Sequence, residues 1–460
     1  MRAEKCLEGL PEEVLRIASR LRAAGGSAYL VGGAVRDWLL AIPATDFDIA
    51  TDLPPDRLEA VFPGSDARSA QLGCFDLSAA DRSICVTSMR TERDYGARRR
   101  PAEVRFVGDP SLDAARRDFT INAVYVDLAS WTMLDPCGGI ADARERILRA
   151  IGDPQSRLAE DPLRMLRGVR FAARCGLSIE PETLEALRRQ AQGARALSAE
   201  RIHAELTAAF TGPGRGRGLA LLADAGLARE ILPEVEAMRD VPQPPDYHPE
   251  GDVLRHTCLV LDHVPAGDPV LAWSAVLHDT GKPGTFRRAK DRIRFDGHDE
   301  LSARIASEVL GRLHADRRTR DRIVAVCRNH IRFAALPAMR PARRRRWMRE
   351  QDFQDHLAFH RADCLGSHGD LSVYEAVRAE FEALPPERPA PLCTGKDVLA
   401  LGVPEGPLVG RLLRAVDEAM CDRWDRGDRE QALELLRELA APHVKTAGPC
   451  VDKDGEGPGG

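Results

Sequence analysis

A glycine pair followed closely by two alternating acids constrains this chain more than any other feature. Gly32 and Gly33 open the run GGAVRD, and Asp46-Phe47-Asp48 follows it. Because side chains two apart on a strand point to one face, Asp46 and Asp48 are expected to bind the same divalent cations. A glycine pair that opens a helix leaves backbone N–H groups free for a triphosphate. A phosphate-binding turn beside paired carboxylates predicts nucleotidyl transfer.

The apolar spacing changes character along the chain. Up to about residue 140, short strand-like runs alternate with helical patterns, whereas from Glu160 onward the spacing is helical almost throughout. The pattern predicts an α+β fold in which a small mixed-sheet head precedes an all-α remainder. The predicted strands are Ala28–Val31, Phe47–Ala50, Ile84–Met89, Val104–Val107 and Ala123–Leu128.

The charge balance places any nucleic-acid contact on local patches. Net charge over the 460 residues is −5, so no global positive field exists. Two arginine runs stand out, Arg98–Arg100 and Arg343–Arg346, the second followed by Trp347. Each run has two interpretations, an RNA contact or a solvated helix face.

Cysteine usage and hydropathy indicate the compartment. The eleven cysteines form no C-x-x-C pair, so neither disulfides nor structural zinc are expected. The N-terminal segment predicts an amphipathic helix without a signal-peptide core, and no apolar run reaches the roughly 18 residues that span a bilayer. We therefore expect a cytoplasmic protein without a membrane contact.

Two further motifs combine charges with apolar residues. In RRDFTINA, Arg117 and Asp118 are expected to flank a sugar and phosphate site, or else to pin a turn as an ion pair. In EDPLRMLRG, Glu160 or Asp161 is placed to cap a helix, and Asp161 and Arg164, three apart, are expected to share one of its faces. The carboxylate would be a hydrogen-bond acceptor and the guanidinium a multiple donor. This pair matches the Watson–Crick edges of cytosine and adenine and does not match those of uracil and guanine. The alternative is an ordinary surface salt bridge.

Histidines concentrate in the second half of the chain, where ten of the twelve lie between His248 and His368. Their order, with the run LHDTGKPG, follows that of HD metal-dependent phosphohydrolases. Imidazole and carboxylate ligands together suit Mn, Ni, Fe or Mg, often as a pair of ions. The predicted ligands are His256, His278, Asp279 and Asp363, with His298 and His330 as further members of the site.

The segment from about Ser27 to Glu205 resembles the class II tRNA nucleotidyltransferases, the bacterial CCA-adding enzymes and their poly(A) polymerase relatives. Two departures are small: Met89 stands where the family often has an aromatic residue, and Cys137 lies in a turn that usually holds a larger one. The motifs that carry the resemblance are GGAVRD, DFDIAT, TERDYGARRRP, RRDFTINA, DPCGGIAD, EDPLRMLRGVRFAARCGL and LSAERIHAEL.

The resemblance implies a role for each motif. Asp46 and Asp48 would hold two Mg²⁺ ions for attack by the tRNA 3′-hydroxyl. The Thr91–Arg100 stretch would be the mobile loop used in switching from C to A, and Thr394–Leu399 with Gly406–Gly410 would contact the tRNA elbow. The implied nucleotide ligands are Gly32, Gly33 and Arg36 for the triphosphate, Arg117 and Asp118 for the ribose, and Asp161, Arg164 and Arg167 for the base.

The implied architecture is a polymerase-beta-like head followed by neck, body and HD domain, with tRNA, CTP and ATP as partners. The sequence leaves the oligomeric state open. The expected segments are an N-terminal helix (1–26), the nucleotidyltransferase head (27–150), a helical neck with the base-recognition motif (151–225), an HD-type domain (226–375), a tRNA-binding body (376–444) and a disordered tail (445–460).

Several functions compete within this frame. The leading hypothesis is addition of C, C and A to tRNA 3′ ends without a nucleic-acid template, and the runner-up is a CC-adding or an A-adding enzyme. A poly(A) polymerase is less favoured, because HD domains do not accompany that branch. HD-bearing relatives imply a phosphatase or 2′,3′-cyclic phosphodiesterase activity. A different class is an RNA-binding head whose only chemistry is HD phosphohydrolysis.

Overall fold

The computed structural model describes residues 10–69, 73–77, 83–95, 101–244, 251–289, 293–384, 392–421 and 428–443. The chain divides into two compact units, residues 1–330 with 361–370 and residues 331–360 with 371–460. The Arg98–Arg100 run, part of the Thr91–Arg100 loop and the tail from residue 445 lie outside the described residues.

The head contains a mixed sheet of seven strands in the order β3-β4-β5-β2-β1-β8-β9. β2 is parallel to β5, and the other neighbouring pairs are antiparallel. All five predicted strands are present, and the predicted mixed sheet is confirmed. The strands are β1 Tyr29–Val31, β2 Asp46–Thr51, β3 Asp66–Ser69, β4 Cys74–Asp76, β5 Ser83–Ser88, β8 Tyr125–Asp127 and β9 Met133–Leu134, with a separate hairpin of β6 Arg90–Tyr95 and β7 Pro101–Phe106.

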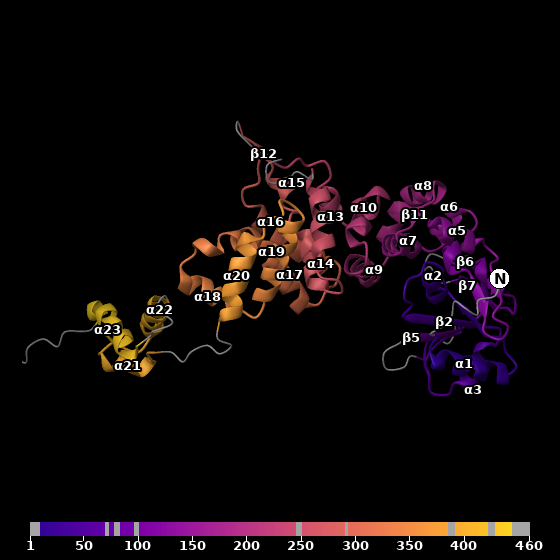
Figure 1. The fold of residues 1–460 in the computed structure, drawn as a ribbon, viewed down its shortest axis with the longest axis horizontal. Coiled ribbons are helices and arrows are strands. Elements are labelled where there is room, and N and C mark those ends of the chain that lie inside the picture. Colours follow the sequence, from indigo (N-terminus) through magenta and orange to yellow (C-terminus); the bar gives the residue numbers. More distant parts are fainter. Residues whose placement is uncertain are drawn as a thin grey trace, which may run out of the picture. The chain divides into compact units, whose positions relative to one another are not determined.

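The two faces of this sheet differ in polarity. Phe47 and Ile49 of β2 are buried in a core that includes Val14 and Leu58. These come from α1 and α3, which therefore pack against the apolar face (Figure 1). Alternation along the strand leaves Asp46 and Asp48 on the opposite face. The head helices are α1 Glu12–Ala23, α2 Gly33–Leu39, α3 Pro55–Val61, α4 Pro110–Ala114, the 3₁₀ turn η2 Thr120–Asn122 and α5 Gly139–Glu145.

Helices dominate from residue 154 onward, as the apolar spacing predicts. Their amphipathic pattern places leucines such as Leu187 and Leu206 in the interior. The neck elements are β10 Ile147–Leu148, α6 Pro154–Glu160, α7 Leu163–Arg174, β11 Ser178–Ile179, α8 Pro181–Gln190, η3 Ala191–Ala196, α9 Ala199–Thr211, α10 Arg215–Asp224, α11 Leu227–Ile231 and α12 Pro233–Glu236.

The histidine-rich region follows as a helical group, seen around α14 and α16 in Figure 1. Asp252 and Asp268 cap its first two helices by accepting backbone N–H groups. Its elements are α13 Val253–His263, α14 Pro269–Leu277, α15 Lys282–Thr285, β12 Arg287–Arg288, β13 Ile293–Arg294, α16 His298–Arg312, α17 Arg317–Ala334 and α19 Phe353–Leu365.

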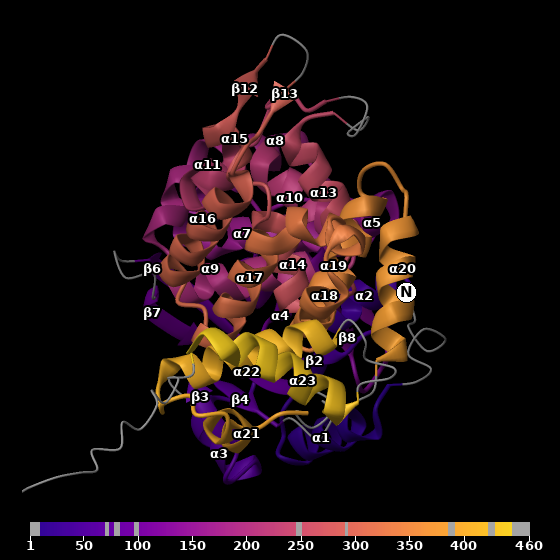
Figure 2. The same ribbon diagram turned by 90° about the vertical axis from the view of Figure 1, so that its left-hand side faces the viewer.

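The second unit has an aromatic core and an aliphatic one. Phe333, Trp347 and Phe353 belong to the first, and Val398 and Leu436 belong to the second. Figure 2 shows α22 and α23 side by side. The elements of this unit not yet named are η4 Leu336–Ala338, α18 Pro341–Met348, α20 Ser372–Ala383, α21 Gly395–Ala400, α22 Pro407–Cys421, α23 Arg429–Ala440 and η6 Ala441–His443.

Part of the arginine run on α18 fits neither of its two interpretations. Arg344 and Arg345 are half-buried and pair with Glu380, so they tie α18 to α20. Arg346 pairs with Glu418 at an exposed site, and Arg343 is exposed. Two of the four arginines therefore have a structural role.

No helix among the described residues combines the length and apolar character that a membrane crossing requires.

Candidate active site and metal centre

Asp46 and Asp48 lie on one face of β2, beside the glycine turn. Asp48 is in register with Val31, the last residue of β1, so the turn begins directly next to it. Gly32 has a φ of 77°, and a Cβ at that residue would lie 2.9 Å from Oδ2 of Asp48. A side chain there would strain the backbone and displace the carboxylate. The two acids and the glycine turn therefore form one site.

The electrostatics of this site favour a cation. Burial raises the pKa of Asp48, the charge of Arg117 opposes this shift, and the like charge of Asp46 adds to it. Among the described residues, neither carboxylate has a hydrogen bond or ion pair that would neutralise it. Paired acids without protein donors fit divalent cations, so the residues present suit the predicted Mg²⁺.

A thiol lies next to these acids. Cys85 of β5 is in register with Asp48 on one side and with Asp76 of β4 on the other. Burial raises its pKa to about 11, and both carboxylates contribute to the shift. The neutral thiol therefore occupies the position beside Asp48 where a third carboxylate would extend the acidic row.

Arg117 is anchored at one edge of its guanidinium and faces the glycine turn with the other. Nε and Nη2 donate to Oδ2 of Asp113 at 3.2 and 3.1 Å, and Nε also donates to the Tyr125 hydroxyl at 2.8 Å. Nη1 lies 3.8 Å from the place where a Cβ of Gly32 would be. The predicted residue is thus at the site, but its ion-pair partner is Asp113 and not Asp118.

Asp118 pairs with Arg167 instead. Oδ2 accepts Nε and Nη2 of Arg167 at 2.9 Å each, and Oδ1 accepts the amide of Asn122 at 3.0 Å. Burial alone would raise the pKa of Asp118, but Arg167 and then Asn122 lower it to about 2. Arg167 also stacks on Phe171, 5.0 Å from the ring centroid. The pair brings two predicted nucleotide-binding residues together, one from the head and one from the neck.

Arg36 is buried in a network of its own. Nε donates to Asp37 at 2.8 Å, Nη1 donates to Asn122 at 3.1 Å, and the guanidinium lies over Phe171. Asp37 also accepts a hydrogen bond from Arg174 of α7. The structure therefore gives Arg36 a clamping role between head and neck, with one nitrogen 3.7 Å from a Cβ position on Gly33.

The histidine-rich region brings all six predicted ligands together. Asp279 lies at the centre, fully enclosed, and its two carboxylate oxygens face different histidines. On the Oδ2 side are Nε2 of His278 at 3.1 Å and Nε2 of His256 at 3.6 Å. Asp363 completes this half, 3.2 Å from His256.

The second half of the cluster uses Oδ1 of Asp279. His298 and His330 place their Nε2 atoms 3.3 and 3.8 Å from this oxygen and 3.2 Å from each other. Asp279 thus joins two groups of potential ligands, His256–His278 and His298–His330. Each carboxylate oxygen of Asp279 thus faces two imidazole nitrogens, and imidazole and carboxylate ligands suit divalent metal ions at both positions.

Backbone carbonyls orient these imidazoles. The Nδ1 atoms of His278, His298 and His330 lie 2.6–2.8 Å from the carbonyl oxygens of the residues three positions earlier. Such a bond fixes the proton on Nδ1 and leaves the Nε2 lone pair for a metal. Burial lowers the pKa of His330 to about 4, which also keeps this ring neutral. The donor set therefore fits a divalent metal.

Comparisons with known proteins cover both regions of the chain. Family models match residues 28–149 (Poly A polymerase head domain), 176–239 (Probable RNA and SrmB- binding site of polymerase A) and 253–386 (HD domain). The A-adding tRNA nucleotidyltransferase of Deinococcus radiodurans is 33% identical over 418 residues, which are 85% of this chain and 91% of that protein. The chain belongs to the tRNA nucleotidyltransferase family.

Other members of this tRNA nucleotidyltransferase family match shorter stretches more closely. The CCA-adding enzyme of Geobacillus stearothermophilus is 39% identical over 216 residues, 47% of this chain and 53% of that enzyme. The crystal structure of the Bacillus stearothermophilus CCA-adding enzyme in complex with CTP superposes with a TM-score of 0.68 at 26% identity. The superposition covers 94% of this chain and 98% of the chain in that crystal structure.

One local prediction about the tRNA nucleotidyltransferase was wrong. Asp161 and Arg164 do not share a helix face, because Asp161 lies outside α7 with φ −145° and ψ 101°. The following Pro162 disfavours a helical conformation at the residue before it. The N-cap residue of α7 is Pro162, but the Asp161 carboxylate one residue earlier still accepts the N–H of Leu163 at 3.0 Å. The ion-pair partner of Arg164 is Glu160, at the end of α6.

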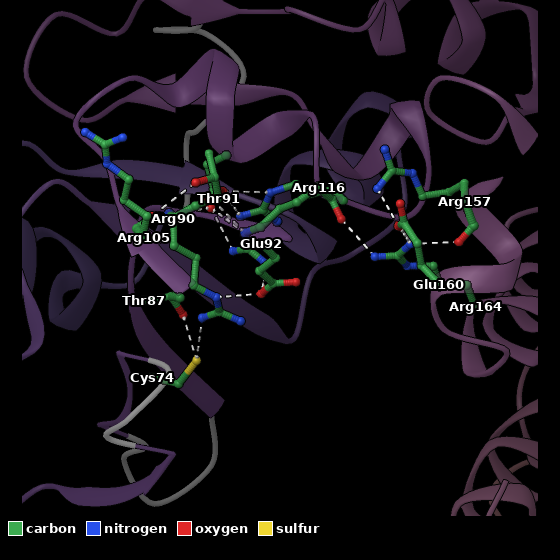
Figure 3. A network of polar contacts seen from close by, with 12 residues as sticks. Cys74, Thr87, Arg90, Thr91, Glu92, Arg105, Arg116, Arg157, Glu160 and Arg164 are labelled. Carbon is green, nitrogen blue, oxygen red and sulfur yellow. Dashed lines mark hydrogen bonds and ion pairs between the residues drawn. The ribbon is translucent and has the colours of Figure 1, made fainter. Parts of the chain in front are cut away.

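Arg164 is also linked to the head through Arg116. Nη2 of Arg164 donates to the carbonyl oxygen of Arg116 at 3.0 Å, and the Arg116 guanidinium contacts Asp113 and Glu92. Glu92 in turn accepts a hydrogen bond from Arg90 at the base of the β6–β7 hairpin, as Figure 3 shows. The neck helix α7 and the hairpin are thus connected by one chain of polar contacts.

Sequence reasoning missed several side chains that hold the two sites. At the HD site, Lys282 pairs with Asp279 at 2.7 Å and donates to Gln243 at 2.6 Å. In the head, Asp113 and Tyr125 hold Arg117. The acid four residues before Arg117 was a usable signal for a paired arginine. Gln243 and Tyr125 gave none, since each reaches its partner only through the fold.

Proposed function

We propose that this protein adds C, C and A to the 3′ end of tRNA, taking the nucleotides from CTP and ATP. The observation that supports this most directly is the position of Asp46 and Asp48 beside the Gly32 turn, in a chain of this family. The proposed site is therefore completed by tRNA, nucleoside triphosphate and Mg²⁺. We assign the reaction to the cytoplasm.

The proposed roles follow from chemistry at each residue. Bound Mg²⁺ would supply Lewis-acid stabilisation of the attacking and leaving oxygens. Asp46 and Asp48 bind and orient these ions through their free carboxylate oxygens. Gly32 and Gly33 present backbone N–H groups to the triphosphate at the start of α2, where the helix dipole is positive. No side chain on Gly32 blocks the approach of phosphate to Asp48.

Arg117 and the Asp118–Arg167 pair are proposed to contact ribose and base. Arg117 places Nη1 toward the glycine turn, where it adds positive charge next to the phosphate site. Asp161 and Arg164 are the proposed base readers. The carboxylate of Asp161 has one oxygen on the Leu163 N–H, which leaves the second to accept from the amino group of cytosine or adenine.

The decisive experiment uses tRNA that lacks its three terminal nucleotides. We expect addition of two nucleotides with CTP alone, none with ATP alone, and three with both, seen as product lengths on a sequencing gel. A matched tRNA that already ends in CC should accept one nucleotide from ATP. If neither of these two tRNAs is extended, nucleotidyl transfer is refuted.

An A-adding enzyme is the second candidate, because a relative that matches over 85% of this chain carries that name. An A-adding enzyme would extend only the tRNA ending in CC and only with ATP. The same assay therefore separates the two functions.

We further propose that residues 253–386, the range matched by the HD family model, hydrolyse phosphate esters with a bound divalent metal, Ni, Mn, Fe or Mg. His256, His278, Asp279 and Asp363 would hold one ion, and His298 and His330 would complete a second position. The supporting observation is the buried central carboxylate of Asp279 between two pairs of imidazoles. Metal analysis and hydrolysis of a 2′,3′-cyclic nucleotide by the His278→Ala/Asp279→Ala variant test this proposal, and unchanged turnover would refute it.

A further inference from the structure

One buried carboxylate organises the groups behind Arg117. Asp113 is fully buried on α4, and its Oδ1 accepts the backbone N–H of Arg90 at 3.1 Å and Nε of Arg116 at 2.8 Å. Its Oδ2 accepts the Tyr125 hydroxyl at 2.6 Å and two nitrogens of Arg117. Elements distant in the sequence thus meet at one acid.

Asp113 is strongly favoured in its ionised form. Burial alone would raise the pKa of Asp113, but Arg117 and then Arg116 lower it to about 2. Burial alone would lower the pKa of Arg117, but Asp113, Tyr125 and Asp48 together outweigh burial and raise it. A buried ion pair of this kind holds its geometry, because separation would leave two charges without solvent.

Tyr125 completes the support from β8. Its ring lies under the Arg117 guanidinium, 5.2 Å from the ring centroid to Cζ, and its hydroxyl both donates to Asp113 and accepts from Nε of Arg117. Nε and Nη2 are therefore occupied on the protein side. Nη1 makes only a long hydrogen bond of 3.5 Å to the carbonyl oxygen of Asn122, and it lies next to Gly32 at the proposed phosphate site.

We propose that Asp113 and Tyr125 are positioning residues that aim Nη1 of Arg117 at the bound triphosphate. This inference rests on the proposed nucleotidyl transfer. Neither residue touches the reacting atoms, so both act through Arg117 and contribute to binding of the nucleoside triphosphate more than to the chemical step. Because Asp113 also holds Arg90 and Arg116, the Tyr125 hydroxyl is the narrower probe.

The first test compares Tyr125→Phe with Tyr29→Phe. Loss of a hydrogen bond to a charged group should raise KM for the incorporated nucleotide about tenfold and leave kcat within about twofold. Tyr29 is a matched control, because its ring packs edge-on against Tyr125, 6.3 Å between centroids, while its hydroxyl interacts with Ser27 and Asp127. Tyr29→Phe should leave both constants unchanged. Equilibrium binding of a non-hydrolysable CTP or ATP analogue gives the same comparison without turnover.

A double-mutant cycle identifies the route of the effect. If Tyr125 acts through Arg117, Tyr125→Phe should change KM less than about twofold in an Arg117→Ala background. An equal rise in both backgrounds would overturn the proposal, as would an unchanged KM in Tyr125→Phe when Arg117→Ala raises it. A merely structural role would instead reduce the active fraction in either background, which titration of active sites measures.

Different results would refute the proposed function and this inference. If wild type and Tyr125→Phe both lack incorporation on trimmed tRNA, nucleotidyl transfer itself is refuted. If wild type incorporates nucleotides and Asp48→Ala does not, transfer stands, and the cycle then decides whether Tyr125 acts through Arg117.

Discussion

The head and the HD region both provide acids for a divalent metal, but they build the site in different ways. In the head, Asp46 and Asp48 both come from one strand, β2. In the HD region, Asp279 lies among imidazoles from several helices and is fully buried. We therefore propose that the head needs substrate phosphates to complete cation binding, whereas the HD cluster would be a standing metal site that binds its ion without substrate.

The largest effect that tests this difference between the two sites is expected from Asp48→Ala. Removal of one of two carboxylates from a two-metal site should lower nucleotidyl transfer at least about a thousandfold, as expected when charge stabilisation in the transition state is lost. Hydrolysis of a cyclic nucleotide by the same variant should stay within twofold of wild type. Gel assays of trimmed tRNA and phosphate release measure the two activities on one preparation. Retained transfer in Asp48→Ala would overturn the two-metal assignment.

The reciprocal change is His278→Ala. We expect this variant to lose bound metal and cyclic-nucleotide hydrolysis, by at least about tenfold in metal affinity, because His278 contacts the shared Asp279. Transfer to tRNA should stay within twofold. Elemental analysis after gel filtration measures the metal, and His263→Ala, on the same helix as His256 but outside the cluster, is the matched control. Equal metal content in His278→Ala and wild type would contradict a standing HD site.

Mild acid should separate the two regions as well. The pKa of His330 is about 4, below its ordinary value, chiefly because burial disfavours the charged ring. Its neutral form contributes stability that is complete above the ordinary pKa near 6.5 and is lost as the pH falls from there toward 4. Asp118 has a pKa of about 2, so its contribution of about 2 kcal/mol is lost only below an ordinary carboxyl pKa, near 3.8.

At pH 5 the metal-free HD region should therefore be less stable than at pH 7.5, while the Asp118–Arg167 pair remains intact. Thermal unfolding of metal-free protein at pH 7.5 and pH 5 measures this difference. Asp118→Asn should lower the melting temperature at both pH values alike. Equal stability of the HD region at the two pH values would contradict a buried, neutral His330.

Local patterns predicted the head site because its acids are two residues apart on one strand. Strand alternation alone places Asp46 and Asp48 on one face, and the antiparallel register of β1 and β2 brings Gly32 to Asp48. The Asp161–Arg164 geometry failed because Pro162 breaks the helical pattern between them. The change of conformation at one residue was enough to give Arg164 a different partner.

Partners fixed only by tertiary contact were beyond sequence reasoning. Gln243 meets Lys282 across a loop, and Tyr125 meets Arg117 from a neighbouring strand. The HD ligands were predictable in spite of their separation because their order along the chain is that of a known domain. Only the folded structure shows that Arg117 pairs with Asp113 and not with Asp118.

The shortage of protein ligands in the head leads to a test at Cys85. A third carboxylate beside Asp48 should add an oxygen ligand, so Cys85→Asp should lower the Mg²⁺ concentration for half-maximal transfer several-fold, about threefold to tenfold. Cys85→Ala, which removes a neutral thiol, should change this concentration less than twofold. Cys74→Asp, on the adjacent strand and opposite Thr87, is the control. An unchanged Mg²⁺ dependence in Cys85→Asp would show that substrate and two acids already saturate the site.

The smallest expected effects come from the arginine run, where neighbours on α18 have opposite roles. Arg344 donates to the carbonyls of Pro337 and Met339 at 3.2 Å each and pairs with Glu380. Arg344→Ala should therefore destabilise the second unit by about 1–3 kcal/mol in a denaturant titration. Arg343 is exposed and forms no ion pair among the described residues, so Arg343→Ala should change stability by less than about 0.5 kcal/mol.

If the exposed arginine contacts RNA, Arg343→Ala should weaken tRNA binding about twofold to threefold and reduce the slope of log affinity against log salt by about one. Filter binding at several salt concentrations measures both quantities. The slope separates the two interpretations of the run, because a phosphate contact releases counterions and a solvated side chain does not. An unchanged slope in Arg343→Ala would assign this residue to a solvated helix face and leave the α18 run with a structural role at Arg344 and Arg345 only.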